Sequence, residues 1–322
     1  MTTLSRRFVC LLLVSLLTVI SVFACGKNLH HNTANWTSSL NDCRIVKHSM
    51  GETCIPENPE RLVTIFHVTL GNVLALGVKP IGSATALNTS QEDLPAYLKH
   101  ETAGIKQLGS QYQPNLETIL LAKPDLILGW ETVRKTYPLI SQIGPTVLGQ
   151  WQGESSWREY FHFVAEVLGK EEAEQQAWLR YYQRVDELKT ALSKQYKNKT
   201  VSVIYAYRGS PTISINTKNS FVGSILEDAG IQRPETQNIT VPGGSYDITE
   251  ESLHDADADV LFILSNDQKT VEALQQKPIW KILKAVQQRR VYPVDDFTWI
   301  GSNLIAANAV IDDLFKYLVN MP

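Results

Sequence analysis

The sequence predicts an α/β fold of two lobes, each built around a parallel sheet, joined by one long helix. Short apolar runs of strand length alternate with amphipathic stretches, this order occurs twice, and a long uninterrupted helical pattern separates the two halves. Continuous apolar strands separated by helices are typical of parallel sheets buried on both faces. A chain of 322 residues is long enough for two lobes of ordinary size.

The first segment, residues 1–24, is predicted to be a signal peptide. Arg6 and Arg7 precede an uncharged run that continues to Ala24, which is the pattern of an export signal. The run ends Val-Phe-Ala-Cys and resembles a bacterial lipobox, so Cys25 is expected to carry lipid and to become the mature N-terminus. An ordinary signal peptide with a chance cysteine is the alternative. The lipid would anchor an exported protein on the periplasmic or extracytoplasmic face of the cell membrane.

Residues 25–42 are polar and without periodicity, which favours a flexible tether. Beyond the tether, Cys43 and Cys54 are the only cysteines of the body. An even number of cysteines in an exported chain indicates a disulfide. A metal site that also uses His48 is the alternative, although the irregular spacing does not match a zinc site.

The N-terminal lobe is expected over residues 43–169 and the C-terminal lobe over residues 198–322. Strand-length apolar runs of the first lobe are Leu62–Phe66, Pro80–Ser83, Asp125–Gly129 and Thr146–Leu148, with helical patterns at Gly71–Leu76, Asn115–Ala122 and Val133–Gln142. The second lobe repeats the order with Val201–Tyr205, Thr212–Ile215, Val260–Leu264 and Val291–Val294 and with helical patterns at Phe221–Asp228, Lys277–Gln288 and Asn303–Val319.

The interlobe helix is expected within residues 170–197. From Glu171 onward neither glycine nor proline interrupts the pattern, and apolar residues recur at spacings of three and four. This periodicity predicts one helix of roughly 25 residues. The apolar positions are Ala177, Trp178, Tyr181, Val185, Leu188 and Leu192.

A local correspondence between the halves supports two similar lobes. Glu117 is followed eight residues later by Asp125 and an apolar strand, and Glu251 is followed eight residues later by Asp259 and an apolar strand. Both stretches, LETILLAKPDLIL and EESLHDADADVLF, indicate a helix start, a turn and a buried strand. The match could also be a common helix-to-strand arrangement without deeper meaning.

Several kinds of chemistry have no motif in this chain. The sequence contains no G-x-S-x-G, no G-x-G-x-x-G and no G-x-x-x-x-G-K-[ST], so no enzymatic activity is predicted. The histidines of the body lack metal-ligand spacing, and neither a metal site nor a cofactor is expected. The chain carries 30 basic and 33 acidic side chains, and the first segment holds two of the basic ones. Nucleic acid is therefore not an expected partner.

Candidate ligand-binding residues follow the predicted strands. In open α/β sheets, ligands bind beyond the carboxyl ends of the strands. Aromatic side chains there give rigid contact area, and arginine can hold carboxylate or hydroxamate oxygens. Any single tryptophan could instead be packed in a core. The candidates are Trp130, Arg134, Trp151, Tyr205, Tyr207, Arg208 and Trp299.

Several segments in order carry a resemblance to a known family. After the lipobox come MGETCIPENPERLVTI, NLETILLAKPDLIL, NSFVGSILEDAGIQRP and ITEESLHDADADVLFIL. With these segments, the chain from Cys43 to Val319 resembles the periplasmic binding proteins of iron-siderophore ABC transporters. The resemblance implies two Rossmann-like lobes with a ligand cleft between them. It also implies a monomer that captures a ferric siderophore or ferric citrate and delivers it to an ABC permease dimer with ATPase subunits.

The resemblance also implies roles for single residues. Glu117 and Glu251 match the two acids with which members of this family dock on permease arginines. Arg208 and Arg233 stand near positions that line the cleft, and Trp299 matches an aromatic near the last strand. Haem or cobalamin are alternative ligands, but no histidine or tyrosine is clearly placed as an axial ligand, so iron should arrive already chelated. An exported enzyme of similar shape and a scaffold lipoprotein are further alternatives.

Overall fold

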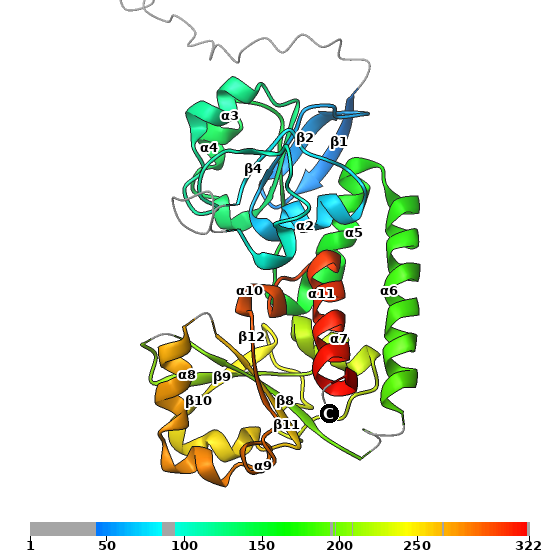
Figure 1. Ribbon diagram of the computed structural model, residues 1–322. Helices are drawn as coiled ribbons and strands as arrows, with labels where there is room; N and C mark the ends of the chain where they lie inside the picture. Colours follow the sequence, from blue (N-terminus) through cyan, green and yellow to red (C-terminus); the bar gives the residue numbers. More distant parts are fainter. Residues whose placement is uncertain are drawn as a thin grey trace, which may run out of the picture. The chain divides into compact units, whose positions relative to one another are not determined.

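The computed structural model describes residues 43–85, 94–193, 196, 198–207, 209–265 and 267–320 (Figure 1). The predicted signal peptide, the lipid-bearing Cys25, the tether over residues 25–42 and Arg208 lie outside the described residues. Within the described ranges, none of the helices has the length and apolar character needed to cross a bilayer. The chain from Asn41 onward forms one compact unit, so the predicted lobe boundaries stay a prediction.

The first sheet is entirely parallel, as predicted. Its order is β5-β4-β3-β6-β7. Every residue of β3, β6 and β7 is buried, which explains why these strands are continuous apolar runs rather than alternating ones. The strands are β3 (Leu62–Ile65), β4 (Gly82–Ala84), β5 (Lys106–Gln107), β6 (Leu126–Trp130) and β7 (Thr146–Gly149).

Short helices connect these strands, and a longer one follows the last of them. They are α2 (His67–Ala75), η1 (Ala96–Leu98), α3 (Leu116–Ala122), η2 (Glu131–Val133), α4 (Tyr137–Ile140), η3 (Glu154–Ser156) and α5 (Trp157–Leu168). Asn115 caps α3 by accepting a hydrogen bond from the backbone N–H of Thr118 at 3.1 Å, as asparagine commonly does at helix starts.

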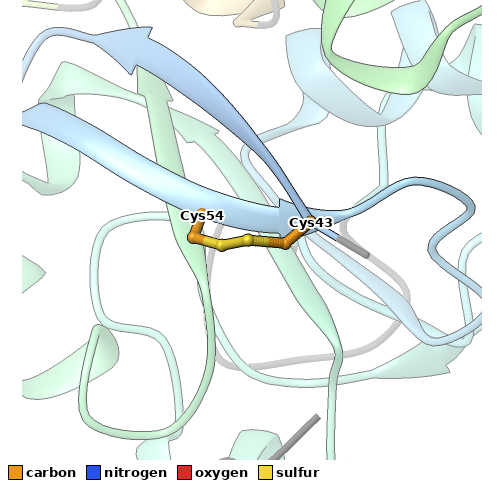
Figure 2. The surroundings of a disulfide bond; sticks show 2 residues. All are labelled: Cys43 and Cys54. Carbon is orange, nitrogen blue, oxygen red and sulfur yellow. A yellow bond between two sulfur atoms is a disulfide. The ribbon is translucent and has the colours of Figure 1, made fainter. Parts of the chain in front are cut away.

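An antiparallel hairpin of β1 (Cys43–His48) and β2 (Gly51–Pro56) precedes the first sheet. A disulfide joins Cys43 to Cys54, whose Cα atoms are 5.7 Å apart (Figure 2). Arg44 donates a hydrogen bond to the carbonyl of Val167 near the end of α5. The backbone N–H of Ser49 donates to Leu148 of β7 at 2.9 Å. The hairpin is therefore fixed to the first sheet and to α5.

Replacing Cys43 and Cys54 together by serine should lower the free energy of unfolding by about 2–3 kcal/mol, because the cross-link restricts the unfolded chain. Urea unfolding with and without a reductant would measure the change. A reductant should shift the parent by a similar amount and leave the double variant unchanged. Equal stability of oxidised parent and variant would show that the hairpin needs no cross-link.

The long helix α6 (Glu171–Leu192) has 22 residues, close to the predicted length. The side chains of Ala177, Tyr181, Val185, Leu188 and Leu192 form its buried face. The helix α11 (Leu304–Leu314) packs along α6 (Figure 1). Arg184 of α6 donates to the backbone oxygen and to Oδ1 of Asn308 at 3.1 and 2.8 Å. In sequence, α6 separates the strands of the first sheet from those of the second.

The second sheet has the order β10-β9-β8-β11-β12. The predicted parallel arrangement holds for β8, β11 and β12, but it is wrong for β9, which pairs antiparallel with both β8 and β10. The link from Ala206 to Thr212 is too short for the crossover that a parallel pair needs, so β8 and β9 form a hairpin. The strands are β8 (Val201–Ala206), β9 (Thr212–Asn216), β10 (Ser245–Thr249), β11 (Val260–Leu264) and β12 (Val291–Val294).

Helical segments complete the second half of the chain. The pattern predicted over residues 277–288 divides into two short helices, and α11 continues into a π-helical turn. The segments are α7 (Phe221–Asp228), η4 (Glu250–Ala256), α8 (Gln268–Gln275), η5 (Pro278–Ile282), α9 (Lys284–Gln287), α10 (Asp296–Trp299), α11 and η6 (Phe315–Asn320).

The correspondence noticed between the two halves of the sequence has a structural counterpart. The carboxylate of Asp125 accepts hydrogen bonds from the backbone N–H groups of Glu60 and Arg61 at 2.8 and 2.9 Å, just before β3. The carboxylate of Asp259 accepts one from the backbone N–H of Thr200 at 3.0 Å, just before β8. Both aspartates thus bridge equivalent neighbouring strands, so the positions around Asp125 correspond to those around Asp259.

A buried contact joins α5 to α7. Trp157 is 1% exposed, its ring lies 5.2 Å from that of Phe221, and its Nε1 donates to the hydroxyl of Ser224 at 3.1 Å. Beside it, Arg158 forms an ion pair with Asp228 at 2.6 Å. This contact connects a helix that follows the first sheet to a helix of the second lobe.

Candidate functional site

Aromatic side chains gather at the carboxyl edge of the first sheet. Trp130, the last residue of β6, lies 4.3 Å from the ring of Trp151, which follows β7. Phe66, directly after β3, lies 4.3 Å from Trp130, and Tyr160 of α5 lies 5.9 Å from Trp151. Parallel strands bring their carboxyl ends to one edge, so residues far apart in sequence meet here.

Phe66 and His67 also belong to this edge, although they were not among the candidates predicted from the sequence. Phe66 has a φ of +82°, which is uncommon for a residue with a bulky side chain. His67 shares a hydrogen bond between its Nδ1 and Oε1 of Gln111 at 2.7 Å. Burial lowers the pKa of His67 to about 4, so the imidazole is neutral at neutral pH. The sequence signal that could have identified these two residues is an aromatic residue and a histidine directly after an apolar run.

Tyr205 and Tyr207 occupy the equivalent edge of the second sheet, at the end of β8. Their ring centroids lie 3.9 Å apart. The hydroxyl of Tyr205 donates to Oδ2 of Asp296 at 2.7 Å, and Asp296 is fully buried. Burial, followed by the hydrogen bond to Asp296, raises the pKa of Tyr205. Both tyrosines are therefore neutral phenols, and Asp296 fixes the position of the first.

Contacts between the lobes bring these two edges together. The ring of His67 lies 6.1 Å from that of Phe297 in α10. The hydroxyl of Tyr97 accepts a hydrogen bond from Nδ2 of Asn303 at 3.0 Å. We use the name interlobe site for the aromatic residues of the two edges, namely Phe66, His67, Trp130, Trp151, Tyr205, Tyr207 and Phe297.

Glu154 is an acidic residue beside the interlobe site that the sequence did not reveal. It lies in η3 and accepts a hydrogen bond from the backbone N–H of Phe221 at 3.4 Å, across the lobes. Burial raises the pKa of Glu154 to about 7. Its charge also contributes to the raised pKa values of Tyr205 and Tyr207. Glu154 therefore links η3 of the first lobe to the start of α7 in the second lobe.

A cavity of about 560 Å³ adjoins the aromatic residues of the first lobe. Tyr160 lines it, as do Gln150 and Gln152, which flank Trp151 in sequence, and Ser155, which follows Glu154. Its volume falls within the range of small-molecule sites. The lining residues are Lys47, His48, Gln150, Gln152, Ser155, Ser156, Glu159, Tyr160 and Phe163.

Three predicted residues are not brought to the interlobe site. Arg134 is exposed and pairs with Glu131 at 2.9 Å. Trp299 is fully buried, and its Nε1 donates to Asp313 at 2.8 Å. Arg233 is 8% exposed and donates to the carbonyl of Asn216 and to Oε1 of Gln237.

The position of Arg233 explains why it does not reach the tyrosines. The preceding residue, Gln232, accepts a hydrogen bond from the backbone N–H of Val201 at 2.8 Å. Val201 is the first residue of β8, and Tyr205 lies near the other end of that strand. The guanidinium thus supports loop and strand backbone at the amino end of the second sheet.

The two acids expected to dock on a permease are both exposed. Glu117 lies in the first turn of α3 and Glu251 in the first turn of η4. Hydrogen bonds from its own backbone and from Thr249 lower the pKa of Glu251, so it is charged. The neighbouring Glu250 pairs instead with Lys277 at 2.6 Å.

The described part of the chain contains no cluster of three or more His, Cys, Asp or Glu side chains that could hold a metal ion. The aromatic rings and phenol hydroxyls of the interlobe site are suited to surround an organic ligand rather than to coordinate a bare cation.

Comparison with known proteins finds relatives that are binding proteins by name. The family model described as periplasmic binding protein matches residues 63–297. The probable siderophore-binding lipoprotein YfiY of Bacillus subtilis is 32% identical over 98% of this chain and 99% of its own length. The Fe(3+)-citrate-binding protein YfmC of the same organism is 27% identical, over 93% of each chain.

A solved structure agrees with these relatives. Staphylococcus aureus SirA complexed with staphyloferrin B superposes with a TM-score of 0.71 and 26% identity, covering 85% of this chain and 98% of that one. All three relatives are binding proteins by name or by complex. From the family match and the full-length relatives, the chain belongs to the periplasmic binding protein family.

Proposed function

We propose that this chain is the substrate-binding component of an ABC importer for ferric siderophore-type chelates. It captures the chelate at the interlobe site and delivers it to a membrane permease. The observation that carries the proposal is that aromatic residues stand at the strand exits of both sheets, Trp130 and Trp151 at one and Tyr205 and Tyr207 at the other. The two edges are in contact through the rings of His67 and Phe297. The relatives named for siderophores and ferric citrate support this substrate class.

The chemistry of the site suits iron that is already chelated. A phenol that is kept neutral is a poor ligand for Fe(III), and burial raises the pKa of Tyr205 and of Tyr207. The same phenols can donate hydrogen bonds to oxygen atoms of a chelate, and the rings give apolar contact to its rim. Arg208, next to Tyr207 in sequence, would add a positive charge for an anionic chelate.

Haem is a less suitable ligand for the described part of this site. His67 is the histidine of the interlobe site, and it is 5% exposed with its Nδ1 held by Gln111. An axial ligand would need an accessible ring nitrogen.

A lipid on Cys25 would keep the protein at the membrane, as expected for a relative of a lipoprotein.

Quenching of tryptophan fluorescence by ferric chelates tests the proposal. The panel should contain ferric citrate, ferric staphyloferrin B, a ferric hydroxamate and ferric bacillibactin, with haem and the iron-free chelators as controls. At least one ferric chelate should bind at submicromolar concentration. Binding of haem alone, or of no member of the panel, would contradict the proposal.

Docking on the permease is tested by changing both exposed acids. The double variant Glu117→Ala, Glu251→Ala should bind the ferric chelate as the parent does. Its rate of iron uptake should fall at least about tenfold, because the charges that orient the protein on the permease are lost. Uptake of radioactive iron into cells expressing each full-length chain at equal level would measure this.

The competing explanation is that each acid only stabilises its helix start. In that case the double variant would be slightly less stable than the parent and would still deliver iron at the parent rate. Normal uptake together with normal chelate binding would therefore contradict docking through these residues.

A further inference from the structure

One face of α3 carries exposed apolar side chains beside the acid. Leu120 and Leu121 are 56% and 66% exposed, whereas Ile119 and Ala122 on the opposite side are buried. Positions three and four residues apart share one side of a helix, so Glu117, Leu120 and Leu121 lie on the same side. We call these three residues the α3 face. Its leucines leave apolar surface in water that a partner could cover.

The second lobe differs at the corresponding positions. Because Asp125 and Asp259 bridge equivalent strands, residues three and four after Glu251 correspond to the two leucines. These residues are His254 and Asp255, whose Nε2 and Oδ1 atoms are 3.4 Å apart. One acid therefore has apolar neighbours and the other has charged or polar neighbours.

We propose that the α3 face binds as a unit to the extracytoplasmic side of the permease, with the leucines in an apolar recess and Glu117 at a basic group on its border. This inference rests on the function proposed above. It adds that docking at the first lobe combines burial of apolar surface with charge pairing, while docking at Glu251 depends on polar contacts. The two lobes would then fit different surroundings, which fixes the orientation of the protein on the permease.

The charge of Glu117 favours this occupant over two others. A symmetric dimer built on the α3 face would bring the same patch of two chains together, placing one Glu117 near the other at an energetic cost. A membrane surface of anionic lipids would repel the acid. A permease with a basic group beside an apolar recess complements both components of the face.

The test compares leucines of equal exposure. Leu121→Ser is set against Leu179→Ser, because Leu179 on α6 is 63% exposed and is far from α3 in sequence. Full-length chains are expressed at equal level in cells that lack the parent gene, and uptake is measured with the ferric chelate that saturates the parent in the fluorescence titration. Leu121→Ser should slow uptake about tenfold, in line with the loss of one leucine contact. The double variant Leu120→Ser, Leu121→Ser should slow uptake further. Leu179→Ser should behave like the parent.

Chelate affinity and melting temperature should be unchanged in all these variants, since exposed side chains contribute little to stability. Parent-like uptake by the leucine pair, with slow uptake by the Glu117, Glu251 pair, would overturn the inference and leave the proposed function intact. Parent-like uptake by both pairs would overturn the docking proposal itself. If the leucine pair abolished a dimer of the parent in sedimentation, or its binding to vesicles of anionic lipid, a second copy or the membrane would be the occupant instead.

Discussion

Replacing Tyr207 with alanine is expected to lower the affinity for the ferric chelate about tenfold to a hundredfold, the effect of losing an aromatic contact at a binding site. Tyr207 is 44% exposed, and its ring lies 3.9 Å from that of Tyr205. It can therefore present one face to a ligand while the other is supported. Fluorescence titration with the chelate that binds the parent would measure the change.

Tyr182 on α6 provides the matched control, because it is also 44% exposed and stacks on another aromatic ring, that of Trp178. Tyr182→Ala should bind the chelate as the parent does. Both variants should remain folded, which circular dichroism would verify. Unchanged affinity in Tyr207→Ala would place the chelate away from the tyrosine pair.

Replacing Trp157 with alanine should have the largest effect on stability, lowering the free energy of unfolding by about 3–5 kcal/mol. Trp157 is 1% exposed and packs against Phe221 and Trp178, with ring centroids 5.2 and 5.4 Å away. Alanine would leave a cavity between α5 and α7. Urea unfolding monitored by circular dichroism would give the difference.

The milder variant Trp157→Phe separates packing from hydrogen bonding. Phenylalanine retains much of the apolar contact and loses the bond from Nε1 to Ser224, which should cost about 1–3 kcal/mol including the smaller ring. If alanine were no worse than phenylalanine, the contact between α5 and α7 would be looser than the structure indicates.

Buried strands were the most predictable part of the fold. β6 and β11 are apolar at every position because both faces of each sheet are covered. The direction of β9 was not predictable in the same way. A short segment such as Thr212–Ile215 has the same composition whichever way the strand runs, and only the short link before it points to a hairpin.

Part of the site was predictable because its residues lie at the carboxyl ends of strands. Trp130 and Tyr205 are the last or nearly last residues of their strands, so the sheet itself determines their position. Trp299 follows its strand through a turn of helix that directs the ring inward onto Phe262, 4.6 Å away. Sequence position places such a residue near the edge without fixing which way its side chain points.

Glu154 was not predictable from local sequence, because its role depends on a contact with the other lobe. The group that it binds is the backbone N–H of Phe221, 67 residues further along the chain. A backbone donor leaves no trace in the sequence, so no pattern could have paired these two residues.

The helix α11 packs against α2, the helix that connects β3 to β4 of the first sheet. Its N-cap residue, Asn303, donates a hydrogen bond to the hydroxyl of Tyr97, 206 residues earlier in the chain. Gly71 of α2 lies so close to Asn303 that any larger side chain there would collide with it. The buried surface of α2 is therefore completed only when the last segment of the chain has been made. A polypeptide that emerges from its N-terminus stays incompletely folded until α11 has been made, which suits the export predicted from residues 1–24.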